Sequence, residues 1–587
     1  KELPSPIKEL IDWDQQRQDV EIKFTQVMEQ FEPEGMIAPK LQAPSPTPAP
    51  ALAGRIDITR LAISDDTGAR LVENVSASFG LDERIAVVGQ VNAGGETVSD
   101  ALARLVWPTT GAIRIGGADI AGIPESTLGR RIGYAGPVPY FPNLSIRDCM
   151  LQGLRHAPLR PAAKEARPED VMEAVAAGNT TLDIDADWID REAAGIDGGE
   201  ALDKRLIAML KLVEMDEEVY QQGLRSRVDP NEHRDLAKHV LWARKELKQR
   251  LADPALAKLV EQFDPERYNK LATIAANLLF GAPVDSAFES DNLPTNAYVL
   301  RVLKETGLDE TLYEMGRRIA STVVELFGDL PPNHPFFEQL SFMTADDLPG
   351  FRAALARTTG QKLVTVSRDD RALLLRLPFR YIETRHRLGL LDEAFEVRIV
   401  EARKRLRASL PANLAAAVAF YDPDAYNTAA SLQENILFGR IAFGIADGPE
   451  RVRKLVQELL EQLGLQEIVY TAGLSFMVGS GGKRLTQPQR QKVALARAVL
   501  KRPDLLILNR SLNALDVKAQ HAIVERLMAL SRDEADGRRM GLFVVLTTPA
   551  LAEIFDRVLC FEDGTIAEDG TPQALKAKNG VYAQLAA

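Results

Sequence analysis

The chain has 587 residues, of which 45% are apolar and 26% are charged, and its formal net charge is −12. This is the profile of a soluble globular protein with roughly two to four domains. The acidic balance and the lack of a long basic run argue against a nucleic-acid partner. Two cysteines, Cys149 and Cys560, are too few for a disulfide framework and indicate a reducing compartment.

Signals for membrane insertion and secretion are missing from the sequence. No apolar run reaches the roughly 18–20 residues that a membrane-spanning helix needs, and no signal peptide is visible. The sequence begins at Lys1 and not at a methionine. We therefore interpret it as a fragment, with further sequence upstream.

The first predicted segment, residues 1–38, is a polar helical lead. Between Gln15 and Phe31, apolar side chains recur among charged ones at roughly helical spacing, which is typical of an amphipathic helix. An ordinary docking helix explains this pattern as well as a specialised role does. Residues 39–53 follow with five prolines and few bulky apolar side chains, so we expect a semi-rigid linker.

Three strand-like runs open the next segment, at 55–63, 70–79 and 84–88, and the third is short and apolar like a buried strand. The stretch 89–97 then reads GQVNAGGET and leads into a helix that ends at Leu105. Strand, glycine-containing loop and helix are the context of a phosphate-binding P-loop, G-x-x-x-x-G-K-[ST].

This glycine loop departs from the P-loop pattern where phosphate and metal should bind. Gly89 and Gly94 stand at the glycine positions, which let backbone N–H groups approach phosphate at a helix N-terminus. The lysine position is Gly95, which removes a charge-assisted contact worth roughly 1.5–3 kcal/mol. The position of the Mg²⁺-binding hydroxyl is Glu96, whose carboxylate repels a polyphosphate. Thr97 offers a hydroxyl only if the loop shifts by one residue.

The most informative stretch is 485–516, LTQPQRQKVALARAVLKRPDLLILNRSLNALD. Helix formers predominate from Gln489 to Leu500, and Pro503 ends that helix because proline cannot continue it. The apolar run 505–508 is typical of a strand buried in a parallel sheet.

This stretch resembles the segment of the ABC ATPase family that carries the signature motif, a helix, the Walker B strand and the D-loop. The resemblance covers about 54–153 and 431–587, with weaker support from 1–38, which in the family follows a membrane helix. It implies ATP with Mg²⁺ as the ligand, held weakly or not at all here. The residues that it offers for nucleotide binding are Gly89, Gly94, Thr97, Gln489 and Asp516.

The residues that should perform the family's chemistry differ in this sequence. The signature Ser-Gly-Gly is replaced at 486–488 by Thr-Gln-Pro, the Walker B aspartate by Asn509, and the catalytic glutamate by Arg510. The Q-loop glutamine is Pro137, and the switch histidine is Thr548. Each loss affects positioning or electrostatics, which supply almost all phosphoryl-transfer catalysis. We therefore assign no catalytic residue and no metal ligand.

The Q-loop and the signature are nearly 350 residues apart, at Pro137 and Leu485, which is far more than in a typical family member. Two segments recur at a constant offset of 158 residues: 264–269 as 422–427, and 277–281 as 435–439. Eight identities at one offset favour duplication over chance. Residues 145–153 are a weaker third copy. The insert is otherwise charged and helix-prone, and we find no chemistry in it.

We predict an α/β fold with an ABC-type P-loop NTPase core, which consists of a RecA-like parallel sheet and an antiparallel β-subdomain, and an enlarged α-helical subdomain. The predicted parts are a helical lead, a linker, a first nucleotide-binding part, a helical insert and a second nucleotide-binding part: 1–38, 39–53, 54–153, 154–430 and 431–587.

Three functions fit the sequence. The first is a structural or regulatory nucleotide-binding-domain portion of an ABC exporter, with weak or no ATP hydrolysis. The second is an ATPase that energises export, and the third is a soluble ABC-like scaffold. The first two imply a membrane domain, upstream or in a partner chain, a second nucleotide-binding domain in a dimer, and a place on the cytoplasmic face of the plasma membrane.

Overall fold

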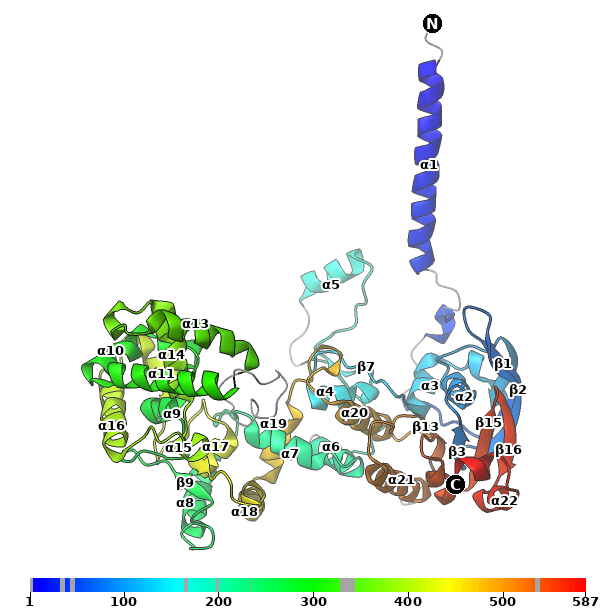
Figure 1. Cartoon of the computed structure of the whole chain (residues 1–587). Helices are drawn as coiled ribbons and strands as arrows, with labels where there is room; N and C mark the ends of the chain where they lie inside the picture. Colours follow the sequence, from blue (N-terminus) through cyan, green and yellow to red (C-terminus); the bar gives the residue numbers. More distant parts are fainter. Residues whose placement is uncertain are drawn as a thin grey trace. The chain divides into compact units, whose positions relative to one another are not determined.

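The structure is a computed structural model that describes residues 4–31, 37–42, 48–162, 167–196, 200–233, 235–327, 344–533 and 539–587. The chain divides into two compact units (Figure 1). Unit 1 comprises Lys1–Glu218 and Met477–Ala587, and unit 2 comprises Val219–Phe476. The predicted boundaries at 153 and 431 separate nucleotide-binding parts from an insert, and they stay a prediction. The linker at 39–53 also stays a prediction, and its residues 43–47 lie outside the described residues.

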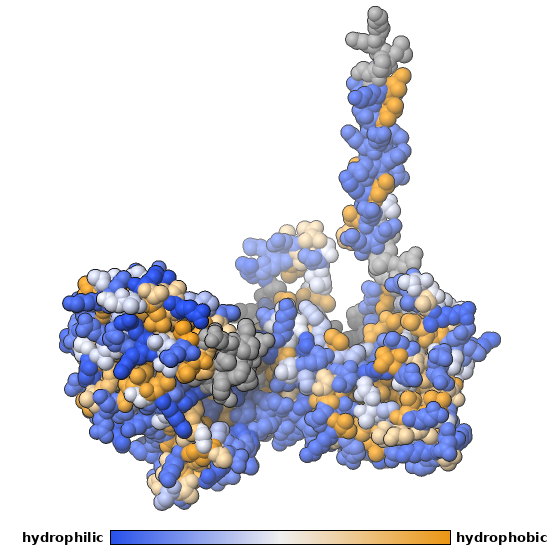
Figure 2. Space-filling view, in the orientation of Figure 1, coloured by the Kyte–Doolittle hydropathy of each residue, from blue (hydrophilic) through white to orange (hydrophobic). Residues whose placement is uncertain are grey.

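The N-terminal helix α1 (Pro4–Phe31) is longer than the amphipathic segment that the sequence predicted. Its apolar side chains are exposed, among them Trp13 at 61% and Phe31 at 70%. Figure 2 shows hydrophobic residues scattered among hydrophilic ones along the helix. Within the described ranges, no helix combines the length and the apolar character needed to cross a membrane.

One sheet of unit 1 is antiparallel, with the strand order β2-β1-β4-β5. Its strands are β1 (Arg55–Ser64), β2 (Arg70–Gly80), β4 (Thr110–Ile115) and β5 (Ala118–Asp119). Along β1, alternate side chains such as Ile56 and Ile58 are buried, which is the pattern of a strand with one face on the core.

The second sheet of unit 1 has six strands in the order β16-β15-β3-β14-β13-β6, all parallel except the edge strand β16. The strands are β3 (Arg84–Gly89), β6 (Ile132–Ala135), β13 (Leu505–Asn509), β14 (Gly541–Val545), β15 (Arg557–Glu562) and β16 (Thr565–Gly570). Every residue of β13 and β14 is buried, as parallel strands covered on both faces require. The prediction of an α/β fold with a mainly parallel and an antiparallel sheet is confirmed.

Helices pack on the six-stranded sheet. Among them, α2 (Gly95–Leu102) packs on β13 and β14, and α20 (Gln487–Leu500) packs on β6. The other helices and strands of unit 1 are α3 (Glu125–Arg131), α4 (Ile146–Leu151), β7 (Arg155–Arg160), α5 (Pro168–Ala176), β8 (Asp187–Ile189), α6 (Glu200–Leu212), α21 (Val517–Arg532), α22 (Pro572–Ala577) and α23 (Val581–Leu585).

In its described residues, unit 2 is helical except for two small antiparallel pairs, β9 (Val260–Gln262) with β12 (Gly439–Ile441) and β10 (Gly281–Pro283) with β11 (Val418–Phe420). Its helices are α7 (Asp216–Arg225, which begins in unit 1), α8 (Leu236–Arg250), α9 (Ile274–Leu279), α10 (Ala297–Glu305), α11 (Leu308–Phe327), α13 (Leu348–Thr358), α14 (Arg368–Arg380), α15 (Glu383–His386), α16 (Glu393–Ala408), α17 (Leu432–Leu437), α18 (Gly448–Gln462) and α19 (Gln466–Leu474).

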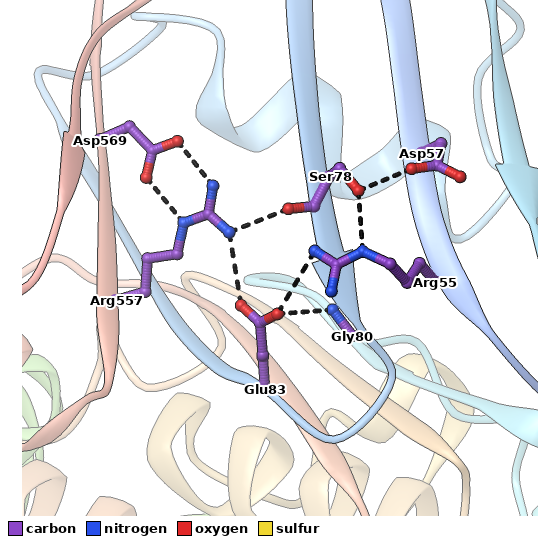
Figure 3. Close-up of polar contacts among 7 residues, drawn as sticks. All are labelled: Arg55, Asp57, Ser78, Gly80, Glu83, Arg557 and Asp569. Carbon is purple, nitrogen blue, oxygen red and sulfur yellow. Dashed lines mark hydrogen bonds and ion pairs between the residues drawn. The ribbon is translucent and has the colours of Figure 1, made fainter.

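A polar network ties the two larger sheets of unit 1 together (Figure 3). Arg557 on β15 forms a bidentate pair with Asp569 on β16, at 2.7 and 2.6 Å, and donates to the Ser78 carbonyl oxygen on β2 at 2.9 Å. It also lies 3.4 Å from Glu83, which accepts from the Gly80 N–H at 2.7 Å. One guanidinium therefore joins the edge of the six-stranded sheet to the antiparallel sheet.

We expect Arg557→Ala to lower the free energy of unfolding by about 1–3 kcal/mol, because charge-assisted hydrogen bonds of partly buried groups are lost. Urea denaturation of the full chain measures this change. Arg114→Ala, which removes an exposed arginine from β4, is the matched control and should leave stability nearly unchanged. Equal effects of the two substitutions would contradict the role of this network.

Candidate functional site

The glycine loop lies between β3 and α2, where the sequence placed it, and close packing explains its two glycines. Gly94 has φ +106° and precedes the first turn of α2. A Cβ there would lie 3.1 Å from the Gly564 Cα and 3.3 Å from the Leu71 carbonyl oxygen. A Cβ at Gly89 would lie 2.7 Å from the Phe561 carbonyl oxygen. Both positions therefore require glycine, since backbone atoms of other elements approach them.

An ion pair joins the first turn of α2, next to this loop, to the residue that follows β13. The guanidinium of Arg510, at the end of β13, lies 2.7 Å from the carboxylate of Glu96 in the first turn of α2. The side chains are only 15% and 20% exposed. The same carboxylate accepts from the Asn92 backbone N–H at 3.3 Å, and Arg510 donates to the Gln90 carbonyl oxygen at 3.4 Å. A carboxylate of the chain itself thus binds a loop N–H that a phosphate would use in a P-loop.

Beside this pair, Asn509 belongs to a buried hydrogen-bond network. Its amide nitrogen donates to the Asp100 carboxylate at 2.8 Å, and the Tyr134 hydroxyl donates to the same oxygen at 2.7 Å. Burial, and then the hydrogen bond to Asp100, raise the pKa of Tyr134 above its ordinary value. Asn509 is 4% exposed, and among the described residues its amide oxygen has no hydrogen-bond partner. The amide thus presents its N–H₂ group to a carboxylate.

The residues present do not fit a Mg²⁺–nucleotide ligand. A side chain at Gly95 would meet the Val87 Cγ1 at 2.6 Å, so the lysine of a P-loop has no room unless Val87 moves. Glu96 and Asn509 are engaged with Arg510 and Asp100 and offer no hydroxyl or free carboxylate to a metal. The described part of the chain contains no cluster of three His, Cys, Asp or Glu residues able to hold a metal ion.

The predicted binding residues separate into two groups. Gly89, Gly94 and Thr97 lie together in the loop and the first turn of α2. Gln489 and Asp516 instead cap the N-termini of helices. Gln489 forms a capping box with Thr486 at the start of α20, and Asp516 accepts from the Ala519 N–H at 2.9 Å at the start of α21. Their assignment to nucleotide binding stays a prediction.

Gln491 connects the segments that correspond to the Q-loop and D-loop, and the sequence analysis missed it. Its side chain, which is fully buried, donates to the Pro137 carbonyl oxygen at 2.8 Å and to Asn513 at 2.5 Å. It also accepts from the Ala514 N–H at 3.0 Å. The sequence gives no signal for this role, nor for those of Asp100 and Tyr134, because all three depend on contacts between distant segments.

We expect Asn509→Asp to lower the free energy of unfolding by about 1–3 kcal/mol at pH 8, because it places a second carboxylate against Asp100. The pair raises a carboxyl pKa in the folded state above its unfolded value. The loss of unfolding free energy is therefore full at pH values above that raised pKa, and it becomes smaller as the pH falls through the raised pKa. Urea denaturation at pH 8 and pH 5 measures the difference. The double variant with Asp100→Asn should restore stability, and an equal loss at both pH values would contradict this explanation.

Comparison with known proteins finds ABC transporters and a lipid A-core flippase among the relatives of this chain, although no protein-family model matches it. A probable multidrug resistance ABC transporter ATP-binding/permease protein, YheI of Bacillus subtilis, is 32% identical over 154 residues, which are 26% of this chain and 24% of that protein. An ATP-dependent lipid A-core flippase of Vibrio parahaemolyticus is 39% identical over 113 residues, 19% and 18% of the two chains. The mitochondrial iron-sulfur clusters transporter atm1 of Aspergillus fumigatus is 27% identical over 252 residues, 42% and 32%.

The matched part of the chain spans less than a third of the length of each of these relatives. A solved structure of a bacterial Atm1-family ABC exporter with ATP bound aligns with 96% of this chain and with 46% of the exporter chain, at 12% sequence identity. The TM-score of 0.39 is too low to establish a common arrangement. The homologues of this chain are ABC transporter ATP-binding/permease proteins, and the resemblance to an exporter-type ABC domain that its motifs predicted is confirmed.

Proposed function

We propose that this chain is the nucleotide-binding-domain portion of an ABC transporter, and that it acts structurally or in regulation, with weak or no ATP hydrolysis of its own. The homology supports the family, and the glycine loop between β3 and α2 supports a P-loop NTPase core. The degenerate positions support the loss of activity, since lysine, hydroxyl, aspartate and glutamate are all replaced around one loop.

The observation that carries this proposal is the ion pair between Glu96 and Arg510. A carboxylate that already accepts from a loop N–H and pairs with a guanidinium 2.7 Å away competes with phosphate for the same donors. Polyphosphate binding must separate this pair and then place its own negative charge beside Glu96. Both steps disfavour ATP.

The same proposal includes partners and a location. The name of YheI describes a protein with both ATP-binding and permease parts, so we propose a membrane domain, upstream in the same chain or in a partner, and a second nucleotide-binding domain in a dimer. The chain would then work at the cytoplasmic face of the plasma membrane.

An ATP-hydrolysing domain that energises export is the second candidate. It is favoured by the printed names of the relatives, two of which are ATP-binding or ATP-dependent transporters. Calorimetry with Mg²⁺ and ATP, with turnover followed in the same sample, separates the two candidates. We expect no binding at millimolar ATP. Turnover above the buffer blank that is lost on unfolding would establish the ATPase instead.

We expect Glu96→Gln to strengthen binding of tripolyphosphate by about tenfold, or ~1.4 kcal/mol, because a neutral amide holds the Arg510 guanidinium and the Asn92 N–H less tightly than a carboxylate and no longer repels the ligand. Calorimetry on the full chain measures this affinity. Glu169→Gln makes the same chemical change on the exposed helix α5 and should have no effect. If both variants bind as weakly as the unaltered chain, the ion pair does not block the loop.

A further inference from the structure

The repeated segments of unit 2 fold alike. Thr273 caps α9 by accepting from the Ala276 N–H at 3.1 Å, and Ser431 caps α17 by accepting from the Glu434 N–H at 3.2 Å. Each helix ends on a phenylalanine in the left-handed conformation, with φ 43° and 42°. The strands that follow, β10 and β12, are equally short.

Two asparagines in each repeat make the same hydrogen bonds. In the first copy, the Asn269 N–H donates to the Asn277 side-chain oxygen at 2.8 Å, and the Asn277 amide donates back to the Asn269 carbonyl oxygen at 2.8 Å. In the second copy, Asn427 and Asn435 exchange the same two bonds, again at 2.8 Å. The repeated sequence is thus a conformational unit, which locks the loop onto the short helix.

A buried arginine completes each copy. Arg403 on α16 donates to the Asn277 carbonyl oxygen at 2.7 Å and to three carbonyl oxygens of 264–267, and its guanidinium lies 4.3 Å from the centre of the Phe280 ring. Arg244 on α8 donates to the Asn435 carbonyl oxygen at 2.8 Å and to three carbonyl oxygens of 422–425. Its guanidinium lies 4.3 Å from the centre of the Phe438 ring. Burial lowers the pKa of both arginines to about 10.

A close helix crossing also recurs. A Cβ at Gly316 on α11 would lie 2.2 Å from the Leu374 carbonyl oxygen on α14. A Cβ at Gly473 on α19 would lie 2.0 Å from the Val219 carbonyl oxygen on α7, and α7 returns the contact through its own glycine, Gly223. The pair α11–α14 therefore corresponds to the pair α19–α7.

The order of these elements along the chain differs between the copies. The inner module, residues 264–421, runs α9, β10, α10, α11, α13, α14, α15, α16, β11, and of these α13 and α15 have no counterpart in the outer module. The outer module, residues 219–263 and 422–476, gives the same order when it is followed from 422: α17, β12, α18, α19 and then α7, α8, β9. We propose that unit 2 consists of two copies of one helical module, related by circular permutation, which associate with each other as two subunits of a dimer would.

Packing supports two modules. One hydrophobic core contains buried residues from Tyr268 to Val418 and lies wholly within the inner module. Another contains residues from Tyr220 to Val260 and from Leu432 to Val469 and lies wholly within the outer module. Each module also pairs its own strands, β10 with β11 and β12 with β9. Neither core needs side chains of the other module.

A third, small aromatic cluster joins the modules with reciprocal contacts. Phe263 of the outer module stacks on Tyr421 of the inner module, with ring centres 4.8 Å apart. The Asn269 amide of the inner module donates to the Glu261 carbonyl oxygen of the outer one at 3.0 Å, and the Asn427 amide of the outer module donates to the Ala419 carbonyl oxygen of the inner one at 2.8 Å. Each module thus contacts the other through the equivalent surface, as the two subunits of a symmetric dimer do. The partner that fits this face is therefore a second copy of the module.

Deleting residues 264–421 from the full chain tests the proposal. The deletion joins Phe263 to Asp422 and keeps the outer module's core, strand pair and arginine contact. We expect hydrogen exchange in 219–263 and 422–476 to stay within about threefold of the intact chain, and the uncovered aromatic face to make the shortened chain a dimer by light scattering. If these segments exchange fast while β3 and β13 still exchange slowly, the proposal is wrong. It is also wrong if these segments exchange slowly but light scattering shows that the shortened chain is a monomer.

Two point variants of the intact chain test it independently. Arg403→Ala should speed exchange in 264–279 at least tenfold and leave 422–437 unchanged, whereas Arg244→Ala should do the reverse. Lys248→Ala, on the exposed side of α8, is the control and should change neither segment. If either arginine variant loosens both segments alike, unit 2 is one cooperative bundle and the two-module proposal fails.

Discussion

The burial of the parallel strands β13, β14 and β3 is the constraint on which the rest of unit 1 depends. A parallel strand with no exposed residue needs cover on both faces, and its carboxyl end must open into a loop at one edge of the sheet. This geometry brings the glycine loop after β3 and the residues after β13 to the same place. It would do so whatever those residues were, because the strands and not the site chemistry fix their positions.

Two departures from the family pattern are physically coupled at that edge. Glu96 alone would leave a carboxylate, and Arg510 alone a guanidinium, in a place that is four-fifths or more buried. An unpaired charge in such a position costs several kcal/mol, whereas the pair compensates both charges. The same reasoning applies to Asn509 and Asp100, since an amide satisfies the carboxylate that a second carboxylate would repel. The site is therefore internally consistent as a folded structure, with each buried charge at its edge paired or hydrogen-bonded.

Local sequence patterns were enough to predict the strands near 55–63, 70–79, 84–88 and 505–508, the glycine loop and the helix that follows the signature position. Apolar runs such as 505–508 identify buried strands, and Gly89 and Gly94 mark a loop that other backbone segments approach. The partners of Glu96 were not predictable, because Arg510 lies more than 400 residues away in sequence. Gln491 was missed for the same reason: a glutamine in the polar first turns of a helix gives no sign that it will be fully buried between two loops.

The repeat shows why a long insertion is tolerated in this helical region. The chain leaves the outer module after Phe263 and returns through Tyr421, and these two residues stack against each other. Because the entry and exit points are adjacent, the inserted segment closes a loop whose entropic cost grows only with the logarithm of its length. Unit 1 carries the same local signature in simpler form. Ser145 caps α4 by accepting from an N–H at 3.0 Å, and the Arg497 guanidinium of α20 lies 5.0 Å from the centre of the Phe141 ring. A capped short helix that packs on an arginine-bearing helix therefore occurs three times in the described part of this chain, as α4 with α20, α9 with α16 and α17 with α8.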